Sequence, residues 1–184
     1  MIRYVPNLLS ALRLLAAPLA AWLIHAGHDT AALLVFAAAG ASDGLDGFIA
    51  RRWGVTSDFG AWLDPAADKL LMLLCLVALC AVGVVPPWLL VLVVSRDSAI
   101  AAGWLMIKLL GVHMEIRALF LGKLSTVFQI LYVLAALLLL AFDLDAPRLM
   151  LAAAWICAGF TVLSAIAYAG VFLGAMRSGR RVAH

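Results

Sequence analysis

The chain has 184 residues, of which 67% are apolar and 12% are charged, and its formal net charge is only +3. Average soluble domains are roughly 45–50% apolar and about 25% charged. A protein of this size could not bury so much apolar surface in its own interior, because its ratio of surface to volume is too high. The composition therefore excludes an ordinary soluble enzyme, a disordered chain and a nucleic-acid-binding protein, and it predicts an integral membrane protein.

Six apolar stretches follow one another along the chain, separated by short polar or turn-forming links. A helix needs about 20 apolar residues to cross the bilayer core, and we expect one helix in each of residues 6–26, 31–50, 60–84, 87–108, 119–142 and 148–175. Links this short predict one all-α domain over residues 1–184, a six-transmembrane-helix bundle. Because Asn7 and Arg13 interrupt the first stretch, we expect residues 2–12 to form an N-terminal interfacial helix.

Basic residues gather on one predicted side of the membrane. That side carries Arg3, Arg51, Arg52, Lys108, Arg117, Lys123, Arg177, Arg180 and Arg181. The opposite side has only Arg148. Since cytoplasmic loops carry an excess of basic residues, both termini are expected in the cytoplasm. The sequence shows no targeting leader before Pro6, which favours a multi-pass protein of a prokaryotic plasma (inner) membrane.

Five of the ten acidic residues fall between positions 43 and 68. Asp43 and Asp46 are three residues apart near the end of the second predicted helix. Asp64 and Asp68 are four residues apart near the start of the third, and residues at both spacings share a helix face. The short link of residues 52–59 folds one helix back beside the other. We therefore expect four carboxylates to converge at the cytoplasmic edge of the membrane.

Four close carboxylates repel one another, so their charge must be neutralised. Two divalent cations would cancel it, and a donor set made only of carboxylate oxygens favours Mg²⁺ or Mn²⁺. Each aspartate also has a structural alternative when it is taken alone. Asp64 precedes Pro65 as a helix N-cap would, and Asp43 and Asp46 could hydrogen-bond in a polar seam between helices.

The spacing of these residues resembles the signature of the CDP-alcohol phosphatidyltransferases. The matching positions are Asp43, Asp46, Gly47, Ala50, Arg51, Gly60, Asp64 and Asp68, and the resemblance extends over nearly the whole chain, including Pro6, Asn7 and Arg13. It implies a site for two divalent cations within residues 43–68, with Asp43, Asp46, Asp64 and Asp68 as metal ligands. Asp68 would also be the general base. The CDP moiety would be bound by Gly47, Arg51, Gly60 and Asn7, and the protein would be a homodimer.

The reaction that this resemblance implies starts from CDP-diacylglycerol. A hydroxyl of the acceptor attacks the phosphorus on the lipid side, and CMP leaves. Three basic residues, Arg96, Arg117 and Lys123, are the candidates for binding the phosphate of an anionic acceptor. Arg96 lies about ten residues into the fourth predicted helix, where a charge is costly, and its alternative is a structural pair with Asp97. Positive-inside topology alone would explain Arg117 and Lys123.

Two further motifs most resemble the cardiolipin synthase branch of the family. They are Ser95-Arg96-Asp97, and Gly122-Lys123-Leu124-Ser125-Thr126 followed by Gln129. This branch transfers the phosphatidyl group to phosphatidylglycerol and so makes cardiolipin. The alternative is a phosphatidylglycerophosphate synthase, which uses glycerol 3-phosphate and usually has Arg-Glu where this chain has Arg96-Asp97. Both acceptors are anionic, so the basic residues do not separate the two reactions.

A divalent-cation transporter is the alternative outside the enzymes, because intramembrane acids also mark ion pathways. Transporters often carry matching broken helices in two repeated halves. Here the acidic residues are concentrated in the second and third stretches, and the fifth and sixth stretches contain no matching acidic residues. The sequence therefore favours the transferase.

Overall fold

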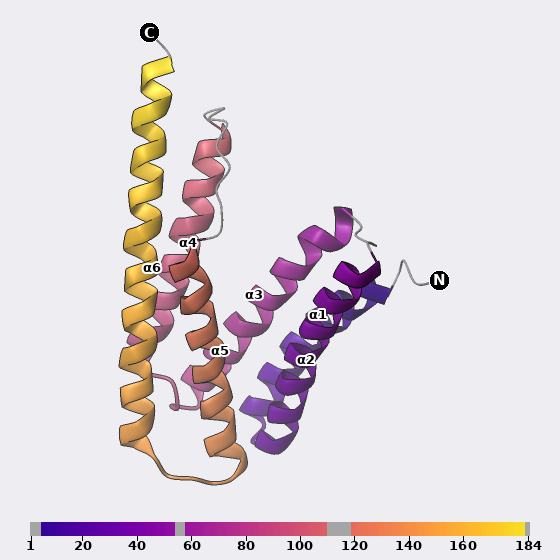
Figure 1. Ribbon diagram of the computed structural model, residues 1–184. Coiled ribbons are helices and arrows are strands. Elements are labelled where there is room, and N and C mark those ends of the chain that lie inside the picture. The colour runs from indigo at the N-terminus through magenta and orange to yellow at the C-terminus, as the bar shows by residue number, and fades with distance from the viewer. Residues whose placement is uncertain (1–4, 54–57, 110–118, 183–184) are drawn as a thin grey trace. The chain divides into compact units, whose positions relative to one another are not determined.

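The structure is a computed structural model that describes residues 5–53, 58–109 and 119–182, and the side chains of residues 11–42, 66–109 and 119–174 (Figure 1). The described residues form six helices and no strand: α1 Val5–His25, α2 Asp29–Trp53, α3 Asp58–Ala81, α4 Pro87–Leu109, α5 Phe120–Ala141 and α6 Pro147–Val182. The all-α prediction is confirmed. The predicted stretches agree with the helices to within three residues at every end except the last.

Three helical segments of the described chain are long and apolar enough to cross a membrane: Pro87–Leu109, Phe120–Ala141 and Pro147–Gly174. Two shorter apolar segments are Ala11–His25 and Asp29–Ser42. These helices make the chain a membrane protein, whereas six spans and an interfacial N-terminal helix stay predictions. The described part of the segment expected at the interface, residues 5–12, is continuous with the rest of α1, which passes through Pro18 without a break.

α6 extends beyond the sixth predicted span, which itself agrees with the apolar segment Pro147–Gly174. The apolar stretch stops near residue 175 because Arg177, Arg180 and Arg181 follow it, but α6 continues to Val182. Arginine is a good helix former and no proline interrupts this segment. Hydropathy therefore marks where the apolar stretch ends, while the helix itself runs on.

Three helices end in the same hydrogen-bonded turn, the Schellman motif, in which one residue takes a left-handed conformation. Gly27 after α1 and Gly83 after α3 have φ angles of 73° and 83°. After α5 the position is taken by Asp143, with φ of 51°, and the N–H of Leu144 donates to the carbonyl of Leu139 at 2.8 Å. These turns stop each helix sharply, and the next helix begins within a few residues.

Asp143→Gly is expected to raise the free energy of unfolding by about 0.5 kcal/mol. The left-handed conformation costs a residue with a side chain about 1–2 kcal/mol, and the greater freedom of glycine in the unfolded chain offsets part of that gain. Gly83→Ala, at the equivalent position after α3, is expected to lower the stability by about 1 kcal/mol. Denaturant unfolding of the detergent-solubilised protein measures both. A loss of stability in Asp143→Gly would contradict the argument.

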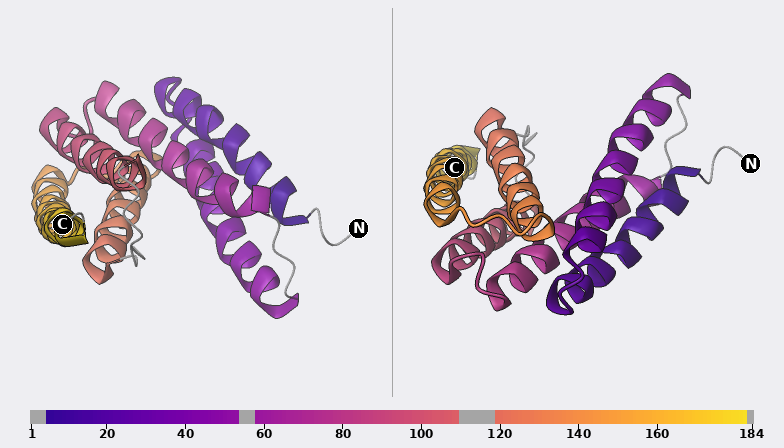
Figure 2. Two further views of the ribbon diagram at one scale, coloured as in Figure 1. Left: turned by 90° about the horizontal axis from the view of Figure 1, so that it is seen from above. Right: turned by 90° about the horizontal axis from the view of Figure 1, so that it is seen from below.

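The chain forms two compact units, and the first comprises Met1–Pro86 and Val133–Pro147. Within it α1 packs along both α2 and α3 (Figures 1 and 2). Alanines of all three helices are buried there: Ala17, Ala20, Ala32, Ala39 and Ala67. Such small side chains let apolar helices approach closely. This packing brings the first helix against the start of the third.

The second unit contains α4, the first part of α5, and α6. Phe128 of α5 stacks on Phe160 of α6, with ring centroids 4.0 Å apart. Trp88 of α4 lies against Trp155 of α6 at 4.9 Å between centroids. The sixth helix therefore packs against both of the others.

Gly103→Ala is expected to lower the free energy of unfolding by about 1–3 kcal/mol, the usual cost of overpacking. A Cβ at position 103 of α4 would lie 2.5–2.8 Å from ring atoms of Phe172 on α6, so the ring would have to move. The matched control is Gly159→Ala on α6, where nothing lies within 4 Å. We expect this control to be neutral or slightly stabilising, because alanine has the better helix propensity. Equal effects at both positions, measured by denaturant unfolding, would refute the close-approach explanation.

Candidate active site

The four predicted metal ligands lie on two successive helices. Asp43 and Asp46 belong to the later part of α2, and Asp64 and Asp68 to the first half of α3. Of these four, only Asp68 is among the described side chains, so the convergence of the carboxylates stays a prediction. The described side chains contain no group of three or more His, Cys, Asp or Glu residues that could hold a metal ion.

The residues predicted to bind CDP lie on the first three helices. Gly47 and Arg51 are in α2, Gly60 is in the first turn of α3, and Asn7 is in the first turn of α1. All four lie outside the residues whose side chains are described, and Arg117 lies outside the described residues altogether. Their predicted contacts with substrates therefore stay predictions.

Asp68 is held by an arginine of the first helix. Nη1 of Arg13 donates to Oδ1 of Asp68 at 2.5 Å. The arginine side chain is 1% exposed, whereas that of the aspartate is 43% exposed. A charge in an apolar helix is costly unless it is paired. Arg13 reaches an acidic partner because α1 packs along α3. The pair anchors one carboxylate oxygen of an otherwise accessible acid.

This ion pair is a feature that the sequence reasoning missed. In the sequence, Arg13 is recognisable only as an interruption of the first apolar stretch and as part of the family resemblance. A lone arginine in an apolar helix is itself a signal that an acidic partner exists. The spacing of residues did not say which acid that partner was, and the packing of α1 against α3 selects Asp68.

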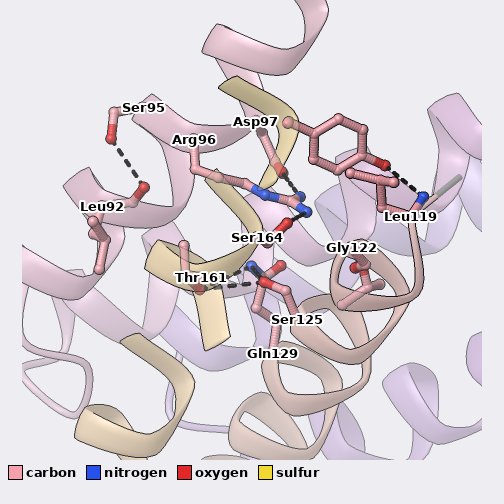
Figure 3. A network of polar contacts seen from close by, with 12 residues as sticks. Leu92, Ser95, Arg96, Asp97, Leu119, Gly122, Ser125, Gln129, Thr161 and Ser164 are labelled. Carbon is pink, nitrogen blue, oxygen red and sulfur yellow. Dashed lines mark hydrogen bonds and ion pairs between the residues drawn. The ribbon is translucent and has the colours of Figure 1, made fainter. Parts of the chain in front are cut away.

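A second polar cluster surrounds Arg96 of α4, whose side chain is buried (Figure 3). Its Nη1 donates to Oδ1 of Asp97 at 2.6 Å, and its Nη2 donates to the hydroxyl of Ser164 on α6. The structural pair considered from the sequence is therefore present. However, the carboxylate of Asp97 contacts only one end of the guanidinium. Nε of Arg96 has no hydrogen-bond partner within the part of the chain that the structure describes.

Tyr168 of α6 also faces this arginine. The guanidinium carbon of Arg96 lies 5.8 Å from the centroid of the Tyr168 ring, within the range of a cation–π contact. The tyrosine hydroxyl accepts a hydrogen bond from the N–H of Leu119 at 3.4 Å (Figure 3). A Cβ at Gly122 would lie 2.9 Å from the same hydroxyl. Tyr168 therefore lies between α4 and the first turn of α5.

The residues of the motif at the start of α5 lie on two different faces of that helix, one buried and one exposed. Ser125 and Gln129 are buried, and Nε2 of Gln129 donates to the hydroxyls of Ser125 and of Thr161 on α6, at 3.3 Å and 3.5 Å. Together with Gly122, these residues form the face that packs on α6, held by interhelical hydrogen bonds. Lys123 is exposed. Within this motif the lysine is therefore the most accessible side chain, while Leu124 and Thr126 are half-buried.

The sequence profile of the CDP-alcohol phosphatidyltransferase family matches residues 3–176. The chain belongs to this family. The match confirms the resemblance inferred from the aspartate spacing. It includes Arg13, all four aspartates, and the cluster around Arg96, so both compact units are part of the family's sequence pattern.

Curated relatives within the family carry two kinds of name. The chain is 35% identical over 182 residues to CDP-diacylglycerol–glycerol-3-phosphate 3-phosphatidyltransferase 1, chloroplastic, of Oryza sativa subsp. japonica, which covers 89% of this chain and 55% of that protein. It is 40% identical over 143 residues to the cardiolipin synthase (CMP-forming) of Streptomyces coelicolor, covering 73% of this chain and 65% of the relative. The CDP-diacylglycerol–glycerol-3-phosphate 3-phosphatidyltransferase of Bacillus subtilis is 36% identical over 146 residues. This alignment covers 79% of this chain and 74% of the relative. The aligned chain thus spans between about half and three quarters of these relatives.

Proposed function

We propose that the protein transfers a phosphatidyl group from CDP-diacylglycerol to a hydroxyl of an anionic acceptor and releases CMP. The observation that carries this proposal is the aspartate motif of α2 and α3, which lies inside the region matched by the CDP-alcohol phosphatidyltransferase family. Asp68, its described member, is an accessible carboxylate with a fixed anchor. Membership of a transferase family also argues against the divalent-cation transporter.

Two divalent cations, Mg²⁺ or Mn²⁺, would be held by Asp43, Asp46, Asp64 and Asp68. Hard cations prefer oxygen donors, and this set offers carboxylates alone. Asp68 is 43% exposed and therefore accessible to an ion, and a carboxylate can accept several contacts besides its bond to Arg13. When bound, the cations would stabilise the charge of the pyrophosphate and of the leaving CMP.

The chain's own residues would carry out the remaining steps. An alcohol is a poor nucleophile, so a carboxylate within reach must take its proton, and we assign this role to Asp68. Arg13 would hold that carboxylate in one orientation. On the donor side, Arg51 can offer a planar pair of N–H donors to a phosphate. Gly47, Gly60 and Asn7 would complete the CDP site.

Phosphatidylglycerol is the acceptor that we favour, which makes the protein a cardiolipin synthase. Its phosphate would be bound by Arg96, Arg117 and Lys123. The Arg96-Asp97 pair and the motif at the start of α5 support this assignment, as does the similarity to the Streptomyces coelicolor enzyme. Glycerol 3-phosphate is the alternative acceptor, supported by the names of the rice and Bacillus subtilis relatives.

We further infer that the protein crosses a prokaryotic plasma membrane six times, with both termini and the active site in the cytoplasm. The concentration of basic residues on one predicted side supports this orientation. A cytoplasmic site also lets a water-soluble nucleotide product leave while the lipid chains stay in the bilayer. A homodimer is the assembly that the family resemblance implies.

A product assay by lipid mass spectrometry tests the proposed function. Purified protein receives CDP-diacylglycerol and Mg²⁺ or Mn²⁺, with phosphatidylglycerol in one sample and glycerol 3-phosphate in another. Cardiolipin and CMP in the first sample alone would support the favoured acceptor. Phosphatidylglycerophosphate in the second alone would replace the acceptor but keep the reaction. If neither forms, and divalent cations cross proteoliposomes that contain the protein, the transporter replaces the enzyme.

A further inference from the structure

Tyr168 links Arg96 to the first turn of α5 by two different parts of its side chain. The ring faces the guanidinium, 5.8 Å from its carbon. The hydroxyl accepts the N–H of Leu119 at 3.4 Å, one of the donors that have no partner within their own helix at a helix N-terminus. Gly122 makes this approach possible, since a Cβ there would lie 2.9 Å from the hydroxyl. The tyrosine therefore fixes a distance between α4 and α5.

Ser164 lies one turn before Tyr168 on the same face of α6. Its hydroxyl accepts a hydrogen bond from Nη2 of Arg96 (Figure 3). Ser164 and Asp97 thus hold the two ends of the guanidinium fork, while Tyr168 covers its face. A long arginine side chain is flexible, so contacts with both its edge and its face are needed to fix its plane.

This buried guanidinium has N–H groups that make no hydrogen bond within the described residues. Arginine has five N–H groups, and within the described residues one bond is made from Nη1, one from Nη2 and none from Nε. Lys123, which follows Gly122 in the first turn of α5, is exposed. The contact between Tyr168 and the α5 turn therefore sets where one cation stands relative to the helix turn that carries the other.

We propose that Tyr168 and Ser164 are positioning residues that fix Arg96 relative to the start of α5, so that the phosphate of the acceptor meets a preset pair of cations. This inference rests on the proposed function, in which Arg96 and Lys123 bind that phosphate. Neither positioning residue touches CDP-diacylglycerol or a metal ligand in this assignment. Their loss should therefore change the use of the acceptor and leave the use of the donor intact.

The test measures kcat and the separate KM values for acceptor and CDP-diacylglycerol with the purified full chain. Tyr168→Leu removes ring and hydroxyl, and we expect the acceptor KM to rise about tenfold or more. Tyr168→Phe keeps the ring and should show a smaller rise, about threefold. Ser164→Ala loses a hydrogen bond to a charged group and should raise the acceptor KM about tenfold. The KM for CDP-diacylglycerol should stay within about twofold of the wild-type value.

Tyr132→Phe is the matched control. Tyr132 is a buried tyrosine of α5, and its hydroxyl has no hydrogen-bond partner among the described residues. Removing that hydroxyl should leave both KM values unchanged. If Tyr168→Leu does not purify as a folded protein, Tyr168→Phe and Ser164→Ala decide the question, because each removes only one polar contact.

A binding experiment separates this inference from the proposed function. Calorimetric titration of glycerol 3-phosphate and of short-chain phosphatidylglycerol, without CDP-diacylglycerol, reports acceptor binding even if no product forms. Weaker binding in Ser164→Ala and Tyr168→Leu than in the wild type supports the inference, whether or not the enzyme turns over. Wild-type binding in both variants overturns it, as does an absence of binding by the wild type. Equal rises in the acceptor and donor KM values would also overturn it, because they indicate a general structural role.

Discussion

Asp68→Asn is expected to lose turnover by a factor of about 10²–10⁴, the usual contribution of a general base. The amide oxygen of asparagine can still accept the hydrogen bond that Arg13 donates to Oδ1. We therefore expect the variant to fold and to retain binding of the divalent cations and of CDP-diacylglycerol. Turnover is measured from CMP release, and cation binding by titration with Mn²⁺ followed by electron paramagnetic resonance.

Two further variants are compared with Asp68→Asn, one at a proposed metal ligand and one at an exposed acid. Asp46→Asn should weaken Mn²⁺ binding more than Asp68→Asn does, because Arg13 already neutralises part of the charge of Asp68, whereas Asp46 is proposed as a ligand alone. Asp145→Asn removes an exposed acid in the link between α5 and α6 and should behave as the wild type. Wild-type turnover in Asp68→Asn would remove Asp68 as the base. Loss of Mn²⁺ binding together with turnover would instead restrict its role to that of a ligand.

Arg13→Met is expected to lower turnover by about 10–100-fold, with little change in the KM for CDP-diacylglycerol. Methionine fills the buried space with an unbranched apolar chain, but it releases the carboxylate that Nη1 holds at 2.5 Å. A misplacement of a reacting group by about 1 Å can cost about 10²-fold in rate. Arg13→Lys keeps the charge and should lose less activity. Steady-state kinetics with both variants measure the difference.

The free energy of unfolding of Arg13→Met shows whether its loss of turnover comes from a misplaced carboxylate or from loss of the fold. Breaking a fully buried ion pair costs about 3–5 kcal/mol because a charge is left without compensation. Here the remaining carboxylate is 43% exposed and can be hydrated, so we expect Arg13→Met to lose only about 1 kcal/mol. Arg148→Met removes an exposed arginine at the start of α6 and should change neither stability nor turnover. A collapse of stability in Arg13→Met would assign the arginine to the fold rather than to the base.

The double variant Arg13→Met with Asp68→Asn tests whether the two residues act as one unit. If the arginine acts only by orienting the base, its removal should add nothing once the base is gone. Turnover of the double variant should then equal that of Asp68→Asn alone. A further tenfold loss would show that Arg13 acts on another group.

Local patterns in the sequence were sufficient to predict the helices of this protein. The apolar stretches that gave the helix bounds depend only on neighbouring residues, and the described links after α1, α3 and α5 contain the residues that end those helices, such as Gly27 and Gly83. The aspartate spacing is equally local, and it led to the family that the profile match confirms. The predicted sixth span, residues 148–175, agrees with the apolar segment Pro147–Gly174, and α6 continues beyond it to Val182 because apolarity and helix formation are different properties.

The tertiary structure decided which distant residues meet. Arg13 and Asp68 are 55 positions apart, and Arg96 and Ser164 are 68 positions apart. Nothing in the spacing of either pair indicates a contact, because helix periodicity relates only residues within a few turns. Each partner is selected by the packing of one helix against another, which small residues such as Ala17 and Gly103 permit. The sequence by itself determined the membrane helices and the family; the packing alone determined which polar side chains anchor the proposed base and the proposed acceptor site.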